Sequence, residues 1–285
     1  MENSLILTLG LPISLGIIMF GMGINLTIKD FKSVFTKPKA TFLGLMNQLI
    51  LVPITAFVLV QFFELSSTIG IGLVIIAACP GGPTSNLISH ICKGDTALSI
   101  SLTALTSIIT VFTIPLYLTL AFNIFDTELD KTIKLPIASI IKQLTLITIL
   151  PVSIGMLFRR FFFNLTEKIK KPMKIISVII LSSIIAGLLV IRRDDLIPYF
   201  KQAGIITLVL NILTMTIGYY SSKIVGLKFQ QAITITVESG IQNATLAIVI
   251  ATSILQNTDM AIPAAIYTIF MYISSAFLMV RFSKK

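Results

Sequence analysis

The sequence predicts an all-α integral membrane protein with about nine membrane-crossing helices. Of its 285 residues, 55% are hydrophobic and only 12% are charged, whereas a soluble domain carries roughly a quarter charged residues. The apolar residues form successive runs of about 20 residues, the length of a spanning helix. Sustained apolar–polar alternation, which marks an outer-membrane barrel, is absent.

Nine apolar segments are expected in order along the chain. They lie at about 5–28, 39–62, 68–92, 95–122, 136–158, 173–191, 200–222, 229–255 and 259–281. No Lys or Arg precedes the first run, which argues against a cleaved signal peptide. Cys79 and Cys92 lie in or near apolar segments, where buried free cysteines are expected.

The basic residues concentrate in alternate connections. Sixteen of the 22 Lys and Arg fall on one side of the predicted membrane, and five fall on the other, namely Lys131, Lys134, Arg192, Arg193 and Lys201. The positive-inside rule makes the richer side cytoplasmic, with the N-terminus outside and the C-terminus inside a cell (inner) membrane. The net charge of +10 therefore indicates topology and no nucleic-acid partner.

The longest basic break, 159–174, lies near the middle of the chain and could join two halves. In transporters such halves are often inverted relative to each other, and each carries one broken helix. The first broken helix is expected in the third segment, at Cys79-Pro80-Gly81-Gly82-Pro83-Thr84-Ser85-Asn86. Proline lacks an N–H and glycine favours breaks, while Ser85 and Asn86 follow where the N-cap of a restarting helix would lie.

The second broken helix is expected in the eighth segment, at Glu238-Ser239-Gly240-Ile241-Gln242-Asn243. Glu238 lies about ten residues from each end of this segment, near the membrane midplane. It alone of the 12 acidic residues is clearly in mid-membrane, where an ionisable side chain marks a functional site by default. A protonated Glu bonded to a neighbouring helix is the structural alternative.

Broken backbone at this depth must be buried in protein or line a polar cavity. Half-helix N-termini attract an anion, and freed carbonyl oxygens attract a cation. The local side chains are oxygen donors, which hard cations prefer, whereas no Lys or Arg is near either break in the sequence. A bound anion is therefore expected to rely on helix dipoles and hydroxyls. Asn211 is a further candidate polar residue, and His90 is expected to have a packing role.

The two breaks, together with Lys93-Gly94-Asp95-Thr96-Ala97-Leu98-Ser99, resemble the bile acid:sodium symporter family, bacterial members included. The resemblance covers essentially the whole chain. It implies an inverted repeat with two crossed discontinuous helices. It also implies a core domain from segments 2–4 and 7–9, and a panel domain from segments 1, 5 and 6. Residues 1–158 would hold the first repeat and the first panel helix of the second half, and residues 159–285 the remainder.

The family binds two sodium ions behind the helix crossing, and the resemblance implies their ligands here. One ion would be held by Ser85, Asn86, Ser99, Thr103 and Glu238. The other would be held by Gln48, Glu238 and Gln242 with the backbone carbonyls of Ser239 and Ile241. Substrate would lie in front of the crossing, near Pro83, Thr84, Asn86 and Asn243, with Asn211 as a further candidate. Pro83 stands where some relatives carry a hydroxyl, so the substrate stays open.

The expected function is sodium-coupled symport of a small organic anion by alternating access, with a bile acid-like, pantoate-like or keto-acid carboxylate as substrate. Membrane lipid is the surrounding partner, and no oligomer is required. A proton-coupled or sodium-independent carrier is the alternative within transport. An intramembrane enzyme is disfavoured because one histidine cannot supply a His-Glu-x-x-His motif and no pair of membrane Asp is present. A sensor or channel is a further alternative.

Overall fold

The computed structural model describes residues 9–125, 135–191 and 196–282, and every named element in these ranges is helical. The first part holds α2 (Leu11–Gly23), α3 (Ile28–Lys32), η2 (Ser33–Thr36), α4 (Pro38–Met46), η3 (Asn47–Leu51), α5 (Val52–Phe62), α6 (Ser67–Ala78), α7 (Ser85–Ile91) and α8 (Thr96–Phe125). The second part holds α9 (Ile137–Leu144), η4 (Thr145–Ile149), α10 (Leu150–Phe161), α11 (Phe163–Ile191), α12 (Leu196–Ile224), α13 (Phe229–Gly240), α14 (Ala244–Val249), η6 (Ile250–Ile254), η7 (Asp259–Ala261) and α15 (Ile262–Phe282).

Five helices within the described residues are long and apolar enough to cross a membrane. They are Pro38–Phe62, Thr96–Phe125, Ile137–Phe161, Ile197–Ile224 and Asp259–Phe282, and a bent pair from Leu11 to Thr36 makes a sixth if it counts as one span. The prediction of an all-helical membrane protein is confirmed, while the count of nine crossings stays a prediction. The basic residues Lys131, Lys134, Arg192, Arg193, Lys284 and Lys285 lie outside the described residues.

Two of the long helices contain a π turn just before a proline. In Pro38–Phe62 the turn η3 precedes Pro53, and in Ile137–Phe161 the turn η4 precedes Pro151. Proline has no N–H to donate, and its ring crowds the carbonyl one turn earlier. Widening that turn by one residue relieves the crowding and lets the helix continue.

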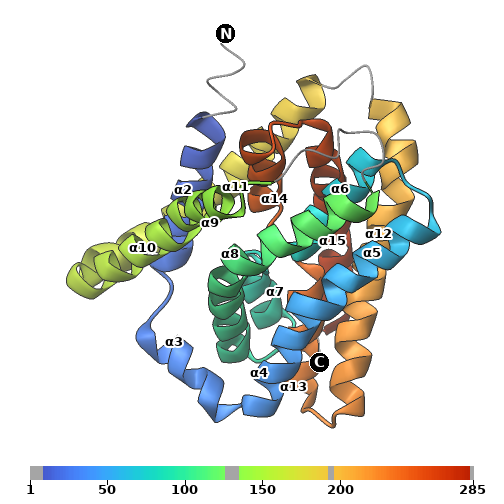
Figure 1. Ribbon diagram of the computed structural model, residues 1–285. Helices are drawn as coiled ribbons and strands as arrows, with labels where there is room; N and C mark the ends of the chain where they lie inside the picture. Colours follow the sequence, from blue (N-terminus) through green and yellow to red (C-terminus); the bar gives the residue numbers. More distant parts are fainter. Residues whose placement is uncertain (1–8, 126–134, 192–195, 283–285) are drawn as a thin grey trace.

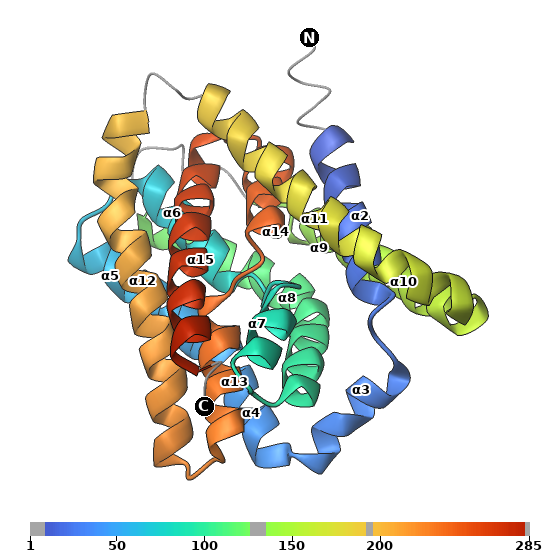
Figure 2. The same ribbon diagram turned by 180° about the vertical axis from the view of Figure 1, so that it is seen from behind.

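The helices divide into two packing groups. One group contains α2, α10 and α11, with α9 attached to it through the continuous helix Ile137–Phe161, and the other contains α4 to α8 and α12 to α15 (Figures 1 and 2). α9 itself packs against α8 of the second group. Within the first group α2 and α10 touch backbone to backbone, because an added Cβ would lie 2.2 Å from Val152 O at Gly23 and 2.5 Å from Phe20 O at Gly155. Small residues at helix contacts allow such close approach inside membranes.

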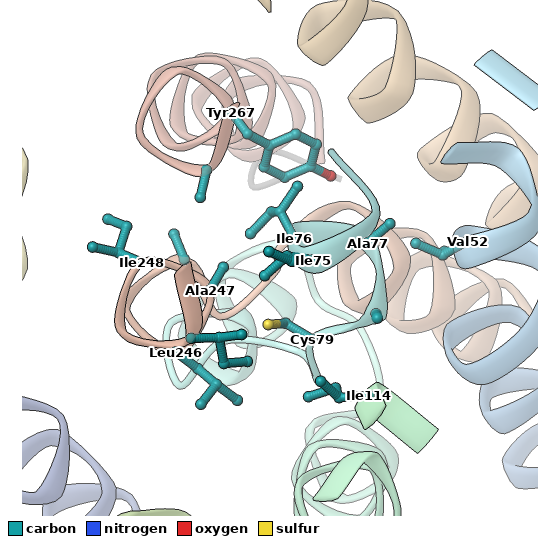
Figure 3. Packing of buried hydrophobic residues seen from close by; sticks show 14 of the residues in the cluster. Val52, Ile75, Ile76, Ala77, Cys79, Ile114, Leu246, Ala247, Ile248 and Tyr267 are labelled. Carbon is teal, nitrogen blue, oxygen red and sulfur yellow. The ribbon is translucent and has the colours of Figure 1, made fainter. Parts of the chain in front are cut away.

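The core of the larger group surrounds its two broken helices. Apolar side chains from α6, α8, α14 and α15 pack around the first break, among them Ile76, Ile114, Leu246 and Tyr267 (Figure 3). Cys79 lies in this core, and both it and Cys92 are buried and free, as the sequence predicts. The apolar packing therefore holds the interrupted segments in place from both sides.

The basic run 159–174 was expected to be a connection, and this expectation is wrong. The helix α10 continues to Phe161, and α11 begins at Phe163, about ten residues before the sixth predicted segment. Lysine and arginine are good helix formers, so a basic run can extend a helix beyond the membrane. The extension places several lysines on a helix that faces the rest of the protein.

Candidate functional site

The two predicted breaks are present, and they cross each other. α6 ends at Ala78 and α7 begins at Ser85, while α13 ends at Gly240 and α14 begins at Ala244. The stretches between them pair in antiparallel fashion at Gly81 and Gln242. Gly82 N donates to Ile241 O over 2.9 Å, and Asn243 N donates to Pro80 O over 2.9 Å. The crossing thus satisfies backbone groups that the breaks release, as buried backbone requires.

Glycine at position 81 allows the two breaks to touch. A Cβ added there would lie 2.3 Å from Glu238 Oε2, a distance that real Cβ contacts do not show. At the second break Asn243 caps α14, because its Oδ1 accepts from Leu246 N over 3.0 Å. The expected caps at the first break are absent. Ser85 and Asn86 lie inside the first turn of α7, which has no side-chain cap.

Ser85 Oγ instead donates to the buried Glu238, and Asn86 Oδ1 faces the hydroxyls beside that carboxylate. The Glu238 side chain is 3% exposed, and its Oε1 lies 2.7 Å from Ser85 Oγ, 2.5 Å from Ser99 Oγ and 3.1 Å from Thr103 Oγ1. Asn86 Oδ1 lies 2.8 Å from Ser99 Oγ and 3.3 Å from Thr103 Oγ1. The structure therefore brings together all five side chains of the first predicted ion site, from α7, α8 and α13.

This cluster holds more acceptors than donor protons. Its three hydroxyls carry one proton each, yet they face both carboxylate oxygens of Glu238, the amide oxygen of Asn86 and the backbone oxygen of Ser99. Glu238 forms no ion pair with any described residue. A buried carboxylate without a cationic partner is costly. A small hard cation among these oxygens would offset that cost.

The residues of the second predicted ion site also lie together, but their amide groups bond to one another. Gln48 Nε2 lies 2.8 Å from Cys79 O and 2.7 Å from Gln242 Oε1, and Gln242 Nε2 lies 2.9 Å from Ser239 O. The Ile241 carbonyl accepts from Gly82 N. Rotation of the two amide groups would turn oxygen atoms towards a cation in place of their N–H groups.

A cavity of about 530 Å³ lies in front of the crossing, and Pro83, Thr84, Asn86 and Asn243 line it. The Nδ2 atom of Asn243 is buried and has no hydrogen-bond partner among the described residues. Four of the five predicted substrate residues therefore face one space, and one of them, Asn243, carries a buried N–H donor without a described partner. His90, for which a packing role was expected, lines the same cavity.

Asn211, the fifth predicted substrate residue, is not among the residues that line this cavity. Its Nδ2 donates to Gly240 O over 2.8 Å, and the Tyr267 hydroxyl donates to the same carbonyl over 3.0 Å. The two side chains satisfy a carbonyl that the second break leaves without a helical partner. Sequence reasoning missed Tyr267, because nothing in its segment distinguishes it from a packing aromatic residue.

Basic side chains line the cavity in front of the breaks, although no Lys or Arg is near either break in the sequence. Lys170, Lys171 and Lys174 on α11 line the same cavity as the crossing. They are more than 60 residues from either break along the chain, so only the fold brings them together. The absence of lysine from the local sequence therefore says nothing about the charge of the cavity.

Comparison with known proteins identifies the family. The model of the sodium bile acid symporter family matches residues 12–199, which is more than half of the chain. This chain belongs to the sodium bile acid symporter family. It is 29% identical over 281 residues to an uncharacterized sodium-dependent transporter, YocS, of Bacillus subtilis, a match that covers 96% of this chain and 83% of the relative.

Plant and animal members of the symporter family are also similar. The probable sodium/metabolite cotransporter BASS1 of Arabidopsis thaliana chloroplasts is 28% identical over 258 residues, 90% of this chain and 62% of the relative. The ileal sodium/bile acid cotransporter of Oryctolagus cuniculus is 28% identical over 248 residues, 85% of this chain and 69% of the relative. All three relatives are named as transporters or cotransporters, so the expectation of a multi-pass membrane transporter rather than an enzyme is confirmed.

Proposed function

We propose that this symporter-family member couples the movement of sodium to the uptake of a small organic anion by alternating access. The observation that carries the proposal is the buried Glu238 carboxylate, surrounded by hydroxyl and amide oxygens and without a cationic partner among the described residues. A sodium ion there would be held by oxygen ligands alone, as hard cations prefer. A bile acid-like, pantoate-like or keto-acid carboxylate is the proposed class of substrate.

Asn86 supplies a physical link between ion and substrate. Its Oδ1 faces the hydroxyls around Glu238, and the residue also lines the cavity. An ion that fixes Asn86 would fix one wall of the substrate site. Substrate would then raise the affinity for sodium by the same factor by which sodium raises the affinity for substrate.

Two ions would make the loaded protein electrically close to neutral. Two Na⁺ bring +2, and Glu238 and a monoanionic substrate bring −1 each. A nearly neutral complex crosses a low-dielectric environment at lower cost. The second ion would lie among Gln48, Gln242 and the carbonyls of Ser239 and Ile241, after the amide groups of the two glutamines rotate.

The larger packing group would act as the core domain, and α2, α9, α10 and α11 would act as the panel against which it moves. The order of a long helix, a broken helix and a long helix occurs twice, as α4–α5, α6/α7, α8 and as α12, α13/α14, α15. This order supports an inverted repeat. With α2, α11 and both broken helices counted as crossings, the total is nine, with the C-terminus in the cytoplasm of a cell whose inner membrane holds the protein.

Uptake by purified protein in proteoliposomes tests the proposal. A panel of small carboxylates would be offered under an inward sodium gradient, a potassium gradient of equal size and a pH gradient. Accumulation driven only by sodium is the expected result. Accumulation that follows the pH gradient and ignores sodium would overturn sodium coupling and assign Glu238 the role of a proton carrier.

A further inference from the structure

The lysines of α11 face the cavity selectively. Lys170 and Lys174 are four residues apart and Lys171 and Lys174 are three apart, so the three share one helix face. All three line the cavity, whereas Lys168, in the same basic run, does not. If these lysines only set the membrane topology by the positive-inside rule, they would not need to face the same cavity.

The cavity wall has uncompensated positive charge. No Asp or Glu is among the described residues that line it. Lys170 pairs with Glu167 one turn earlier, but no described acidic side chain forms an ion pair with Lys171 or Lys174. Charges of one sign that line a concave wall act together on an entering ion. The wall is therefore built to meet an anionic group.

A second polar region lies at the buried end of the same cavity. Asn243 is 2% exposed, and its Nδ2 atom has no described hydrogen-bond partner. Lys171 and Lys174 are exposed, so the lysines mark the open end. Apolar side chains such as Ile18 and Leu181 line much of the remaining wall. At about 530 Å³, the cavity is in the range of drug-sized ligand sites, and a short monoacid at the crossing would leave its basic end empty.

We propose that Lys170, Lys171 and Lys174 form a second anion subsite at the open end of the cavity, so that the preferred substrate is an organic dianion. One acidic group would lie at the helix crossing beside Asn243, and the other would lie at the lysines, with an apolar chain between them. This inference rests on the proposed transport of organic anions and adds the class of substrate. The charge balance argued above for a monoanion would apply to the acidic group at the crossing, and the lysines would meet the second negative charge.

Binding of matched acids to the purified protein tests the inference. The probes are the straight-chain dicarboxylates from succinate to sebacate, each beside the monoacid of the same length, and thermal stabilisation is measured in sodium and in potassium. At least one dicarboxylate is expected to bind about tenfold more tightly than its monoacid, as charge-assisted hydrogen bonds allow. Added choline chloride should weaken this preference, because salt screens exposed charges.

Charge removal identifies the subsite. The triple variant Lys170→Gln, Lys171→Gln, Lys174→Gln should bind dicarboxylates and monoacids alike, because dicarboxylate binding should weaken more than monoacid binding. The matched control Lys168→Gln removes a charge from the same run outside the cavity and should keep the preference. A triple variant that keeps the full preference, or a wild type that binds every pair equally, would overturn the inference.

Comparing binding in sodium with binding in potassium distinguishes a failure of this inference from a failure of the proposed function. A sodium-dependent response to monoacids without a preference for dicarboxylates would refute the dianion and leave symport intact. A lysine-dependent preference that is the same in sodium and potassium would support the subsite and count against sodium coupling. No response to any acid in either medium would count against both.

Discussion

Ser99 Oγ stands between Glu238 Oε1 and Asn86 Oδ1, at 2.5 and 2.8 Å, and has one proton for two acceptors. Because its one proton cannot satisfy both acceptors, this hydroxyl oxygen is better placed to coordinate a cation than to form hydrogen bonds with them. At the scale of residues, the ion site therefore depends on individual hydroxyl groups as well as on the one carboxylate.

Ser99→Ala should weaken sodium binding about tenfold, or about 1.4 kcal/mol, because it removes one oxygen ligand. Isothermal titration of the purified protein with sodium chloride measures the change. The matched control is Ser107→Ala on the same helix, since Ser107 Oγ donates to the backbone oxygen of Thr103 over 2.7 Å and does not reach Glu238. Equal sodium affinity in both variants would contradict the assigned role of Ser99.

Tyr267→Phe should lower the free energy of unfolding by about 1 kcal/mol, because Gly240 O then keeps only the Asn211 donor. The same change should reduce sodium affinity, since Gly240 lies two residues after Glu238. Thermal unfolding with and without sodium measures both effects. Tyr220→Phe on the exposed surface is the control. A loss of stability with unchanged sodium affinity would limit Tyr267 to a packing role.

At the scale of elements, the crossing depends on the absence of a side chain where the two broken helices meet. Gly81→Ala would force a Cβ to within 2.3 Å of Glu238 Oε2. The carboxylate is held by three hydroxyls, so it cannot turn away without losing them. We expect a cost of about 1–3 kcal/mol and the loss of the sodium response in thermal unfolding.

Gly187→Ala is the matched control, because an added Cβ there meets no atom within 4 Å. It should leave both stability and the sodium response near wild type. Gly81→Ala protein that unfolds and responds to sodium like the wild type would show that the close approach at the crossing is not required.

The first break could be predicted from the sequence, because the run Pro80-Gly81-Gly82-Pro83 cannot continue a helix, and the second because Gly240 lies among polar side chains in the middle of an apolar segment. Glu238 could be predicted for a similar reason, as a carboxyl group far from any membrane surface. The position of the cavity lysines could not be predicted, because the basic run 159–174 has the composition of a connection between helices. Its helical form depends on the helix propensity of lysine and arginine and on packing against α2. Asn211 was assigned to substrate because a lone membrane amide does not reveal its partner.

At the scale of the whole molecule, the proposed mechanism requires the two packing groups to move relative to each other. The lysines lie on α11 in one group, and the helix crossing lies in the other. A movement between the groups would therefore change the distance between the two proposed anion subsites. The membrane face that the open end of the cavity meets would set the side from which substrate enters in this state, whereas the gradients of sodium and substrate would set the net direction of transport.

Single-cysteine labelling tests the proposed topology. Cys79 and Cys92 are buried, so a membrane-impermeant maleimide should report only introduced residues. Lys168→Cys should react in inside-out vesicles, and Lys201→Cys should react in right-side-out vesicles, because the positive-inside rule places them on opposite faces. Reaction of both from the same face would refute the proposed arrangement.

The central claim is that Glu238 and its neighbours bind sodium. Thermal unfolding of purified wild type and Glu238→Gln in sodium chloride, potassium chloride and choline chloride at equal ionic strength tests it most directly. We predict that sodium alone raises the wild-type Tm, as expected for a stabilisation of about 2.7 kcal/mol when the sodium concentration is about one hundred times Kd. The folded Glu238→Gln variant should show no sodium-specific change. A wild type indifferent to sodium, or a Glu238→Gln variant with the wild-type response, would contradict the claim.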